Sequence, residues 1–62
     1  MTKIKLIEEF KKLGFTMNEK MGGNFYCVFN EKNNEVKSFS TIKKGIVELK
    51  DVKGNLDYFL NK

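Results

Sequence analysis

Residues Lys20 to Phe29 read KMGGNFYCVF, and this stretch sets the register of the predicted sheet. Gly22 and Gly23 can adopt the positive φ values of a two-residue type I′ turn. The residues before them, from Phe15 to Met21, alternate between apolar and polar as a strand does. The residues after them, from Asn24 to Asn30, include three aromatic side chains and a valine, which favour extended backbone. The stretch therefore predicts a β-hairpin.

A polar turn and a third strand are predicted after the hairpin. Residues 31–34 read EKNN, and asparagine tolerates the left-handed backbone of a turn. The segment from Glu35 to Ile42 is then expected to be a strand that ends before Lys43, Lys44 and Gly45. Three consecutive strands joined by short turns form an antiparallel meander.

Helices are predicted at both ends of the chain. Thr2 is a suitable N-cap for a helix that runs to Leu13, and Gly14 follows as a C′ glycine. The apolar residues of this helix recur at helical spacing, at Leu6, Ile7, Phe10 and Leu13. Near the C-terminus, Asn55 can cap a second helix. Its expected apolar face holds Val52, Leu56, Phe59 and Leu60. Residues 46–52 fit a short strand, a loop or the start of a helix.

The 62 residues are therefore predicted to form one small α+β domain, residues 1–62, with the order α-β-β-β-α. Both helices are expected on one face of the three-stranded antiparallel meander. A domain of this size buries only about 60% of the surface that its unfolded chain exposes, so its stability is marginal. With one cysteine and no histidine, the chain can form neither an internal disulfide nor a four-ligand zinc site. Good packing or oligomerisation must supply the stability, and a homodimer is compatible with the sequence.

Large apolar side chains are predicted on both faces of the sheet. Directly opposed residues of an antiparallel pair share a face. One face then holds Phe25, Cys27, Phe29, Val36 and Ile42. The other holds Tyr26, Val28 and Phe39. A two-residue turn at the glycines adds Met17 and Met21 to the Tyr26 face, whereas a one-residue bulge moves them to the Phe25 face.

Two helices can cover only one of these faces. We expect Phe25, Cys27 and Phe29 to be core residues. The remaining side chains, Tyr26, Val28 and Phe39, are then expected to form a partly exposed patch that binds a partner. The alternative is that a loop over residues 43–49 folds across them.

The residue types argue against catalysis. The chain has no histidine, the usual general acid or base near neutral pH. Glu8 and Glu9 are neighbours in a helix and so point in different directions. Cys27 is expected to be a buried apolar residue, because no histidine is present to activate its thiol. We therefore expect no enzyme activity, no catalytic residue, no metal and no cofactor.

The sequence predicts no targeting or membrane segment. The N-terminus MTKIKLIEEF carries acidic residues by position 8 and lacks the apolar run of a signal peptide. No stretch approaches the roughly 20 apolar residues of a membrane span. A single free cysteine fits a reducing compartment. We expect a cytoplasmic protein without a membrane partner.

Lysine alone supplies the positive charge. All 12 basic residues are lysines, and eight acidic residues leave a net charge of +4. A basic domain attracts polyanions, and lysine suits phosphate contacts better than base edges, which arginine reads with its bidentate fork. The candidate phosphate contacts, near the start of the last helix, are Lys43, Lys44, Lys50 and Lys53. The alternative is that these lysines only keep the surface soluble.

Several short stretches share a pattern with a known family. The chain opens with KLIEEFKKLGF, in which Gly14 and Phe15 stand where the family has Gly-Trp. Gly22, Gly23 and Asn24 stand where it has Gly-Ser-His, and LKDVKGNLDYFL is similar to its approach to the last helix. In these respects the chain resembles the HicA-type toxins of bacterial toxin–antitoxin pairs. The resemblance implies a fold like that of a double-stranded RNA-binding domain. The family's catalytic histidine falls at Asn24, which cannot act as a general base, so the resemblance implies a nucleic-acid-binding scaffold without ribonuclease activity.

Two functions are compatible with these features. The first is a noncatalytic module that binds the nucleic-acid backbone through lysines. The second is a small regulator or inhibitor of a host protein, of the kind that phages and mobile elements encode, which acts through an exposed aromatic sheet face. The basic charge favours the first, because a nucleic-acid mimic would be acidic.

Overall fold

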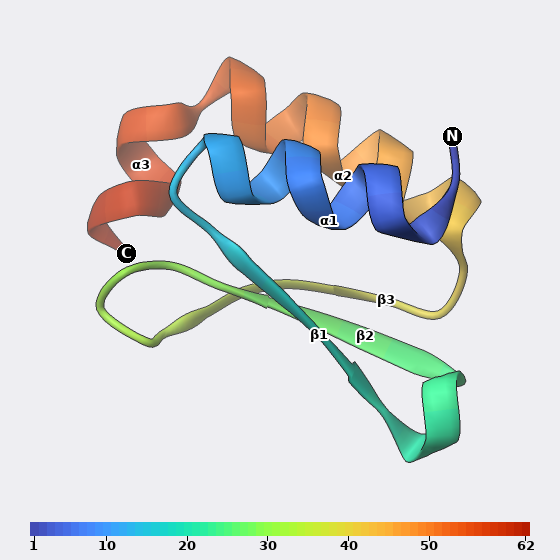
Figure 1. The fold of residues 1–62 in the computed structure, drawn as a ribbon. Coiled ribbons are helices and arrows are strands. Elements are labelled where there is room, and N and C mark those ends of the chain that lie inside the picture. Colours follow the sequence, from blue (N-terminus) through green and yellow to red (C-terminus); the bar gives the residue numbers. More distant parts are fainter.

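The computed structural model describes residues 1–62 as two layers, a three-stranded sheet and a set of helices packed on one of its faces (Figure 1). The elements in chain order are α1 (Lys3–Lys12), β1 (Thr16–Lys20), β2 (Phe25–Phe29), β3 (Glu35–Phe39), α2 (Ile42–Gly54) and α3 (Leu56–Asn61). The strands are antiparallel and lie in the order β1-β2-β3. The predicted α-β-β-β-α order and the meander are confirmed, and the C-terminal helical part consists of two helices.

The first helix begins and ends where the sequence predicts. The Thr2 hydroxyl accepts a hydrogen bond from the backbone N–H of Lys5 at 3.2 Å, which satisfies a free donor of the first turn. Leu13 is the C-cap residue, and Gly14 follows with φ of 97°, a left-handed value that favours glycine. The chain can therefore leave α1 and enter β1 within a few residues.

The hairpin between β1 and β2 is longer than predicted. Lys20 pairs with Phe25, so the connection spans residues 21–24 and contains a short 3₁₀ turn. Gly22 and Gly23 both have positive φ, but they do not form a two-residue turn. Because two and four residues give the same parity, Met17 still pairs with Val28, on the Tyr26 face. Met21 leaves the sheet and lies exposed in the turn.

The predicted third strand is too long at its C-terminal end. β3 ends at Phe39, and the Thr41 hydroxyl caps α2 by accepting from the N–H of Lys44 at 3.1 Å. Residues 42–54 form one helix, which includes the segment 46–52 that the sequence left open. Glycine is a poor helix former, yet Gly45 lies inside α2. A Cβ at this position would stand 2.5 Å from the Phe39 ring and 2.6 Å from Leu6, so a larger residue would clash with the core. This glycine lets α2 approach the core closely.

The helices cover the opposite face of the sheet from the one predicted. Tyr26, Val28 and Phe39 are 8%, 0% and 4% exposed and belong to the core, so the predicted exposed patch is wrong. The ring centroid of Phe39 lies 6.3 Å from that of Phe10 and 5.7 Å from that of Tyr26. Phe25 and Phe29 are only half-buried.

The two edge strands, β1 and β3, explain why the helices cover this face of the sheet. Met17 of β1 pairs with Val28, and an irregularity of pairing between Val28 and Phe29 lets Val36 of β3 join the core as well. On the other face, β1 offers only polar side chains, at Thr16, Asn18 and Lys20. Only the Tyr26 face is therefore apolar across all three strands, and burying it removes the most apolar surface from water.

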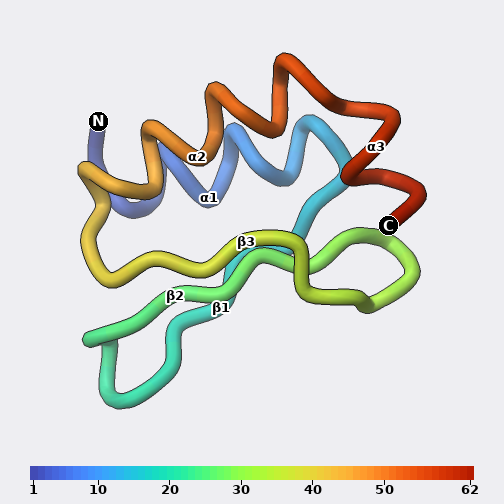
Figure 2. Tube along the Cα trace, turned by 180° about the vertical axis from the view of Figure 1, so that it is seen from behind, coloured from blue at the N-terminus to red at the C-terminus, as the bar shows by residue number.

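The β2–β3 loop lies against the C-terminal end of the chain, as the views from the front and from behind both show (Figure 2). The side-chain amide of Asn30 donates to the carbonyl oxygen of Phe59 at 2.9 Å. The Lys32 ammonium donates to the Asn61 carbonyl at 3.1 Å, and the Asn34 amide donates to the Lys62 carbonyl at 3.2 Å. The loop thus supplies partners for carbonyl groups that the end of α3 leaves free.

Candidate functional site

The four lysines predicted to contact phosphates all lie on α2. Lys43 and Lys50 are seven residues apart and therefore lie on the same side of the helix. Val47, which is 63% exposed, lies between them on that side. No ion pair of the structure involves Lys43, Lys44 or Lys50. The structure thus brings two of the predicted lysines together with their charges uncompensated.

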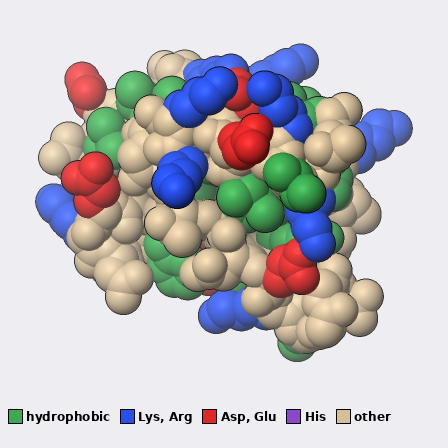
Figure 3. Space-filling view, viewed as in Figure 1, with side chains coloured by type: hydrophobic (Ala, Val, Ile, Leu, Met, Phe, Trp, Pro, Cys, Tyr) green, Lys and Arg blue, Asp and Glu red, His purple; other side chains and the backbone are tan.

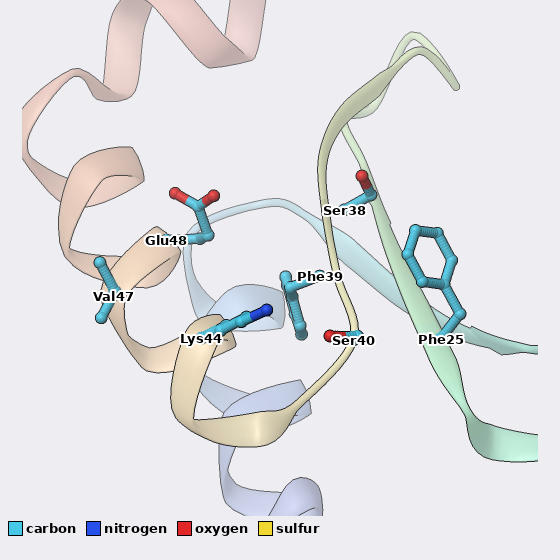
Figure 4. A pocket seen from close by; sticks show the side chains of 7 residues that line it. All are labelled: Phe25, Ser38, Phe39, Ser40, Lys44, Val47 and Glu48. Atoms are coloured by element: carbon cyan, nitrogen blue, oxygen red, sulfur yellow. The ribbon is translucent and has the colours of Figure 1, made fainter.

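The other two predicted lysines point elsewhere. The Lys53 amine lies 3.7 Å from a carboxylate oxygen of Glu9 on α1, so its charge is shared across the two helices. Lys44 is displaced by about 100° around the helix from Lys43 and extends toward the end of β3 (Figure 4). The four lysines therefore do not form one cluster.

The net charge of the protein is confined to α1 and α2, which we call the helical layer. These two helices carry eight lysines and four acidic residues, and the rest of the chain carries four of each. Lysine side chains accordingly gather along the upper part of the molecule, over the helices, with acidic groups among them (Figure 3). The rest of the chain, which comprises the sheet, the loops and α3, is together electrically neutral.

Glu9 is surrounded by three lysines at the contact between α1 and α2. One of its carboxylate oxygens lies 3.0 Å from the Lys12 amine and 3.9 Å from the Lys5 amine, and the other lies near Lys53. The hydrogen bond from Lys12, followed by the charges of the lysines, lowers the pKa of Glu9 below its usual range. One carboxylate cannot balance three cations, so the cluster stays positive.

Sequence reasoning did not include α1 in the candidate site. Lys5, Glu9 and Lys12 recur at helical spacing, and this signal places them on one side of α1. What the sequence did not provide is the neighbour of that side, because residues 46–52 were not assigned to a helix. Once α2 lies beside α1, Lys53 of α2 joins Lys5 and Lys12 of α1 around Glu9.

Lys37 is the most enclosed lysine, and its charge is matched within the protein. Its amine lies 3.2 Å from Glu48 and 2.5 Å from Asp51, both on α2, and 4.9 Å from the centroid of the Phe59 ring. Burial lowers the pKa of Lys37, but the hydrogen bonds to Asp51 and Glu48 outweigh it, so the pKa is raised overall. Lys37 therefore ties β3 to α2 and adds no free charge.

A hollow of about 400 Å³ runs between the end of β3 and the first turns of α2. It is lined by Phe25, Ser38, Phe39, Ser40, Lys44, Val47 and Glu48 (Figure 4). We call it the edge groove, because β3 is an edge strand of the sheet. A smaller hollow of about 290 Å³ lies at the other edge, between α1 and β1.

The uncovered face of the sheet differs from the predicted partner-binding patch. It carries Phe25 and Phe29, with the Lys20 amine 5.7 Å from the centroid of the Phe29 ring. Cys27 lies between them and is only 2% exposed. Burial, with Glu35 adding to it, raises the pKa of the Cys27 thiol, so the thiol stays protonated at neutral pH.

The remaining features add no chemistry to the site. Asn24 lies exposed in the β1–β2 turn. No three side chains of the acidic, cysteine or histidine types lie close enough together to hold a metal ion. The longest helix, α2, has 13 residues, and no helix is long and apolar enough to cross a membrane.

Comparison of the chain with protein-family models, curated proteins and solved structures finds no match.

Proposed function

We propose that the protein is a noncatalytic module whose helical layer binds the phosphate backbone of a nucleic acid. The observation that carries the proposal is the confinement of the whole net charge of +4 to α1 and α2. A one-sided concentration of lysines attracts a polyanion, and neutralising phosphates releases their counterions. Because the sheet carries no net charge, a polyanion is attracted to the helical layer and not to the sheet.

The central contacts of the proposed interface are Lys43 and Lys50. Neither has an acidic partner, and they are separated by about 10 Å along the helix axis, so they would meet different phosphates. Lys44 and Lys53 lie at the borders of this surface, beside the edge groove and Glu9. Lysine contacts of this kind position a backbone without reading its sequence.

The resemblance to HicA-type toxins is compatible with this proposal. The resemblance implies a fold like that of a double-stranded RNA-binding domain, and the present chain packs α1, α2 and the short α3 on one face of a three-stranded sheet. Asn24 at the position of the family's histidine agrees with binding in the absence of cleavage. The proposal does not depend on the resemblance, because the charge distribution supports it independently.

Binding of labelled duplex RNA and duplex DNA, measured by fluorescence anisotropy over a series of salt concentrations, tests the proposal. Affinity should fall steeply as salt rises, with a slope that reports the number of phosphates neutralised. The double variant Lys43→Glu with Lys50→Glu should bind at least about tenfold more weakly than the unchanged protein at low salt.

The matched control is the double variant Lys20→Glu with Lys62→Glu, which changes the net charge equally but outside the helical layer. This control should keep most of the affinity. Equal losses in the two double variants, or no binding of either duplex at low salt, would overturn the proposal. Binding that does not respond to salt would do the same.

The protein-binding alternative loses the surface on which it was based, because Tyr26, Val28 and Phe39 are buried.

A further inference from the structure

Exposed lysines form two rows on the side of the helical layer that faces away from the sheet. Lys5 and Lys12 lie seven residues apart on α1, and Lys43 and Lys50 have the same spacing on α2. Seven residues make about two turns, or about 10 Å along a helix. The two helices run side by side in the same direction, as both views show (Figures 1 and 2). Packed helix axes lie about 8–10 Å apart. The four lysines therefore form a two-dimensional array.

The array keeps a positive charge. Two carboxylates, of Glu8 and Glu9, lie among its lysines, and the Lys53 amine adds a fifth cation, 3.7 Å from Glu9. Five ammonium groups against two carboxylates leave this side of the layer positive. The acidic residues of α2 lie on another side of that helix, toward β3, where both contact Lys37.

The helical layer offers no ring on which a base could stack. Phe10 is the only aromatic residue of α1 and α2, and it is fully buried. The rings that are not buried, of Phe25, Phe29 and Tyr58, belong to the uncovered face of the sheet and to α3. Proteins that hold single strands without reading their sequence combine a basic groove with such rings. The array could hold a single strand by charge alone.

The helical layer also lacks the side chains that read base edges. The chain has no arginine and no glutamine, and none of its asparagines lies within α1 or α2. These are the residue types that bond in pairs to guanine or adenine. Ile4 and Val47, the exposed apolar residues of the two helices, form no hydrogen bond to a base. The layer is therefore equipped to contact phosphates.

The two helices are together too wide to enter a groove of a double helix. Both pack directly on the sheet, through buried residues such as Leu6 and Leu49, so neither projects far beyond the other (Figure 1). Side by side they are about 20 Å wide, whereas the grooves of B-DNA are about 12 Å and 6 Å wide. A layer of this width lies across a groove and reaches the backbones on both sides of it. Flexible lysine side chains can adapt to either width.

We propose that the helical layer binds double-stranded nucleic acid, RNA or DNA, in preference to a single strand, by contacting the backbones of both strands across a groove. The row on α1 contacts one strand and the row on α2 contacts the other. This inference rests on the proposed function and names the substrate class of the same surface. A duplex also presents about one negative charge per 1.7 Å of its axis, twice the density of either of its strands.

Fluorescence anisotropy with a duplex and with an unpaired single strand of equal length, each as RNA and as DNA, tests the proposal. Both duplexes should bind at least about tenfold more tightly than the single strands at low salt. The slope of log affinity against log salt should be about −3.6 for four neutralised phosphates of a duplex and about −1.4 for two phosphates of a single strand.

Each row is then removed in turn. The double variants Lys5→Ala with Lys12→Ala and Lys43→Ala with Lys50→Ala should each reduce the size of the duplex slope by about 1.8. Lys20→Ala with Lys62→Ala, which lie outside the helical layer, is the matched control and should leave the slope unchanged. Thermal melts show whether each variant folds.

A DNA duplex with uncharged methylphosphonate linkages in one strand tests the contact with two backbones. If both strands are contacted, neutralising either strand should reduce the size of the slope by about half. A protein that holds a single backbone would simply use the charged strand and would keep its slope.

The possible failures are distinguishable. If no nucleic acid binds at low salt, the proposed function fails and this inference fails with it. If a single strand binds as tightly as a duplex, the proposed function stands and this inference is overturned. It is also overturned if only one kind of duplex binds, if one row can be removed without changing the slope, or if a duplex with one uncharged strand binds like the unmodified duplex.

Discussion

The side-chain amide of Asn30 donates a hydrogen bond to the backbone carbonyl of Phe59 across 29 positions of the chain. Its oxygen accepts from the backbone N–H groups of Lys32 and Asn34 at 3.0 and 3.1 Å. One buried side chain therefore shapes the β2–β3 loop and fixes that loop to α3. Asn30 is the only polar residue in the buried set, and every one of its bonds holds two elements or a turn together.

Replacing this residue should destabilise the protein. Asn30→Ala leaves the Phe59 carbonyl and two backbone donors without partners, which is expected to cost about 2 kcal/mol in the free energy of unfolding. Urea unfolding followed by circular dichroism measures the change. Asn18→Ala, on the exposed side of β1, is the control and should change stability by less than about 0.5 kcal/mol. Similar values for the two variants would contradict the role of Asn30.

The two glycines of α2 should respond oppositely to alanine. A methyl group at Gly45 would collide with Phe39 and Leu6, so Gly45→Ala should destabilise by about 1–3 kcal/mol although alanine favours a helix. At Gly54 nothing lies within 4 Å of the position that a Cβ would occupy, and Gly54→Ala should leave stability unchanged or raise it by up to about 1 kcal/mol. Thermal unfolding of both variants decides the matter, and a stabilising Gly45→Ala would show that α2 does not approach the core closely.

Stability at high pH should depend on Lys37. Because the pKa of Lys37 is raised, its contribution is fully present below the ordinary value of 10.5 and is lost as pH rises through the higher pKa of the folded state. The variant Lys37→Met should cost about 1 kcal/mol at neutral pH and progressively less at alkaline pH. Urea midpoints of both proteins measured across this pH range give the difference, which should shrink as pH rises above 10.5 and vanish above the folded-state pKa. A constant difference would contradict the ion pairs with Glu48 and Asp51.

The variant Glu9→Gln should bind nucleic acid more tightly. It removes the one carboxylate among Lys5, Lys12 and Lys53, so affinity for duplex RNA or DNA at low salt should rise by about two- to fivefold. The pKa of Glu9 is lowered, so its effect on stability is present above its ordinary value of 4.5 and is lost as pH falls through the folded-state value. Glu31→Gln, outside the helical layer, is the charge-matched control for the anisotropy measurement. Equal gains in both variants would count against a localised interface.

Cys27 should react slowly with thiol reagents in the folded protein. Its side chain is buried between Phe25 and Phe29, and the raised pKa of its thiol leaves little reactive thiolate at neutral pH. The rate of modification should therefore follow unfolding and should rise steeply with added urea. A fast reaction in the absence of urea would show that the uncovered face of the sheet opens readily.

Local signals in the sequence predicted the first helix and the second strand. Thr2 and Gly14 delimit α1 because a capping hydroxyl and a left-handed glycine act within one turn of the chain. The strand β2 is dense in aromatic residues, and its pairing with Phe39 follows from parity. These features depend on near neighbours, which a sequence displays directly.

The choice of the covered face depended on contacts that the sequence does not display. The two faces of β2, one with Phe25 and the other with Tyr26, are both apolar, so the sequence of β2 alone does not show which face the helices cover. The covered face is determined by Met17 on β1 and by the irregular pairing that turns Val36 inward. Gly45 misled the prediction of α2 for a related reason, because the absence of its side chain serves a close contact with Phe39 and Leu6 that only the folded chain creates.

The concentration of net positive charge on α1 and α2 also affects how the molecule approaches a charged partner. With its excess of lysines on the helices and a neutral sheet behind them, the protein has a permanent electric dipole that runs from the sheet to the helical layer. A polyanion at a distance would rotate the molecule so that α1 and α2 face it. The sheet would then point away from that polyanion.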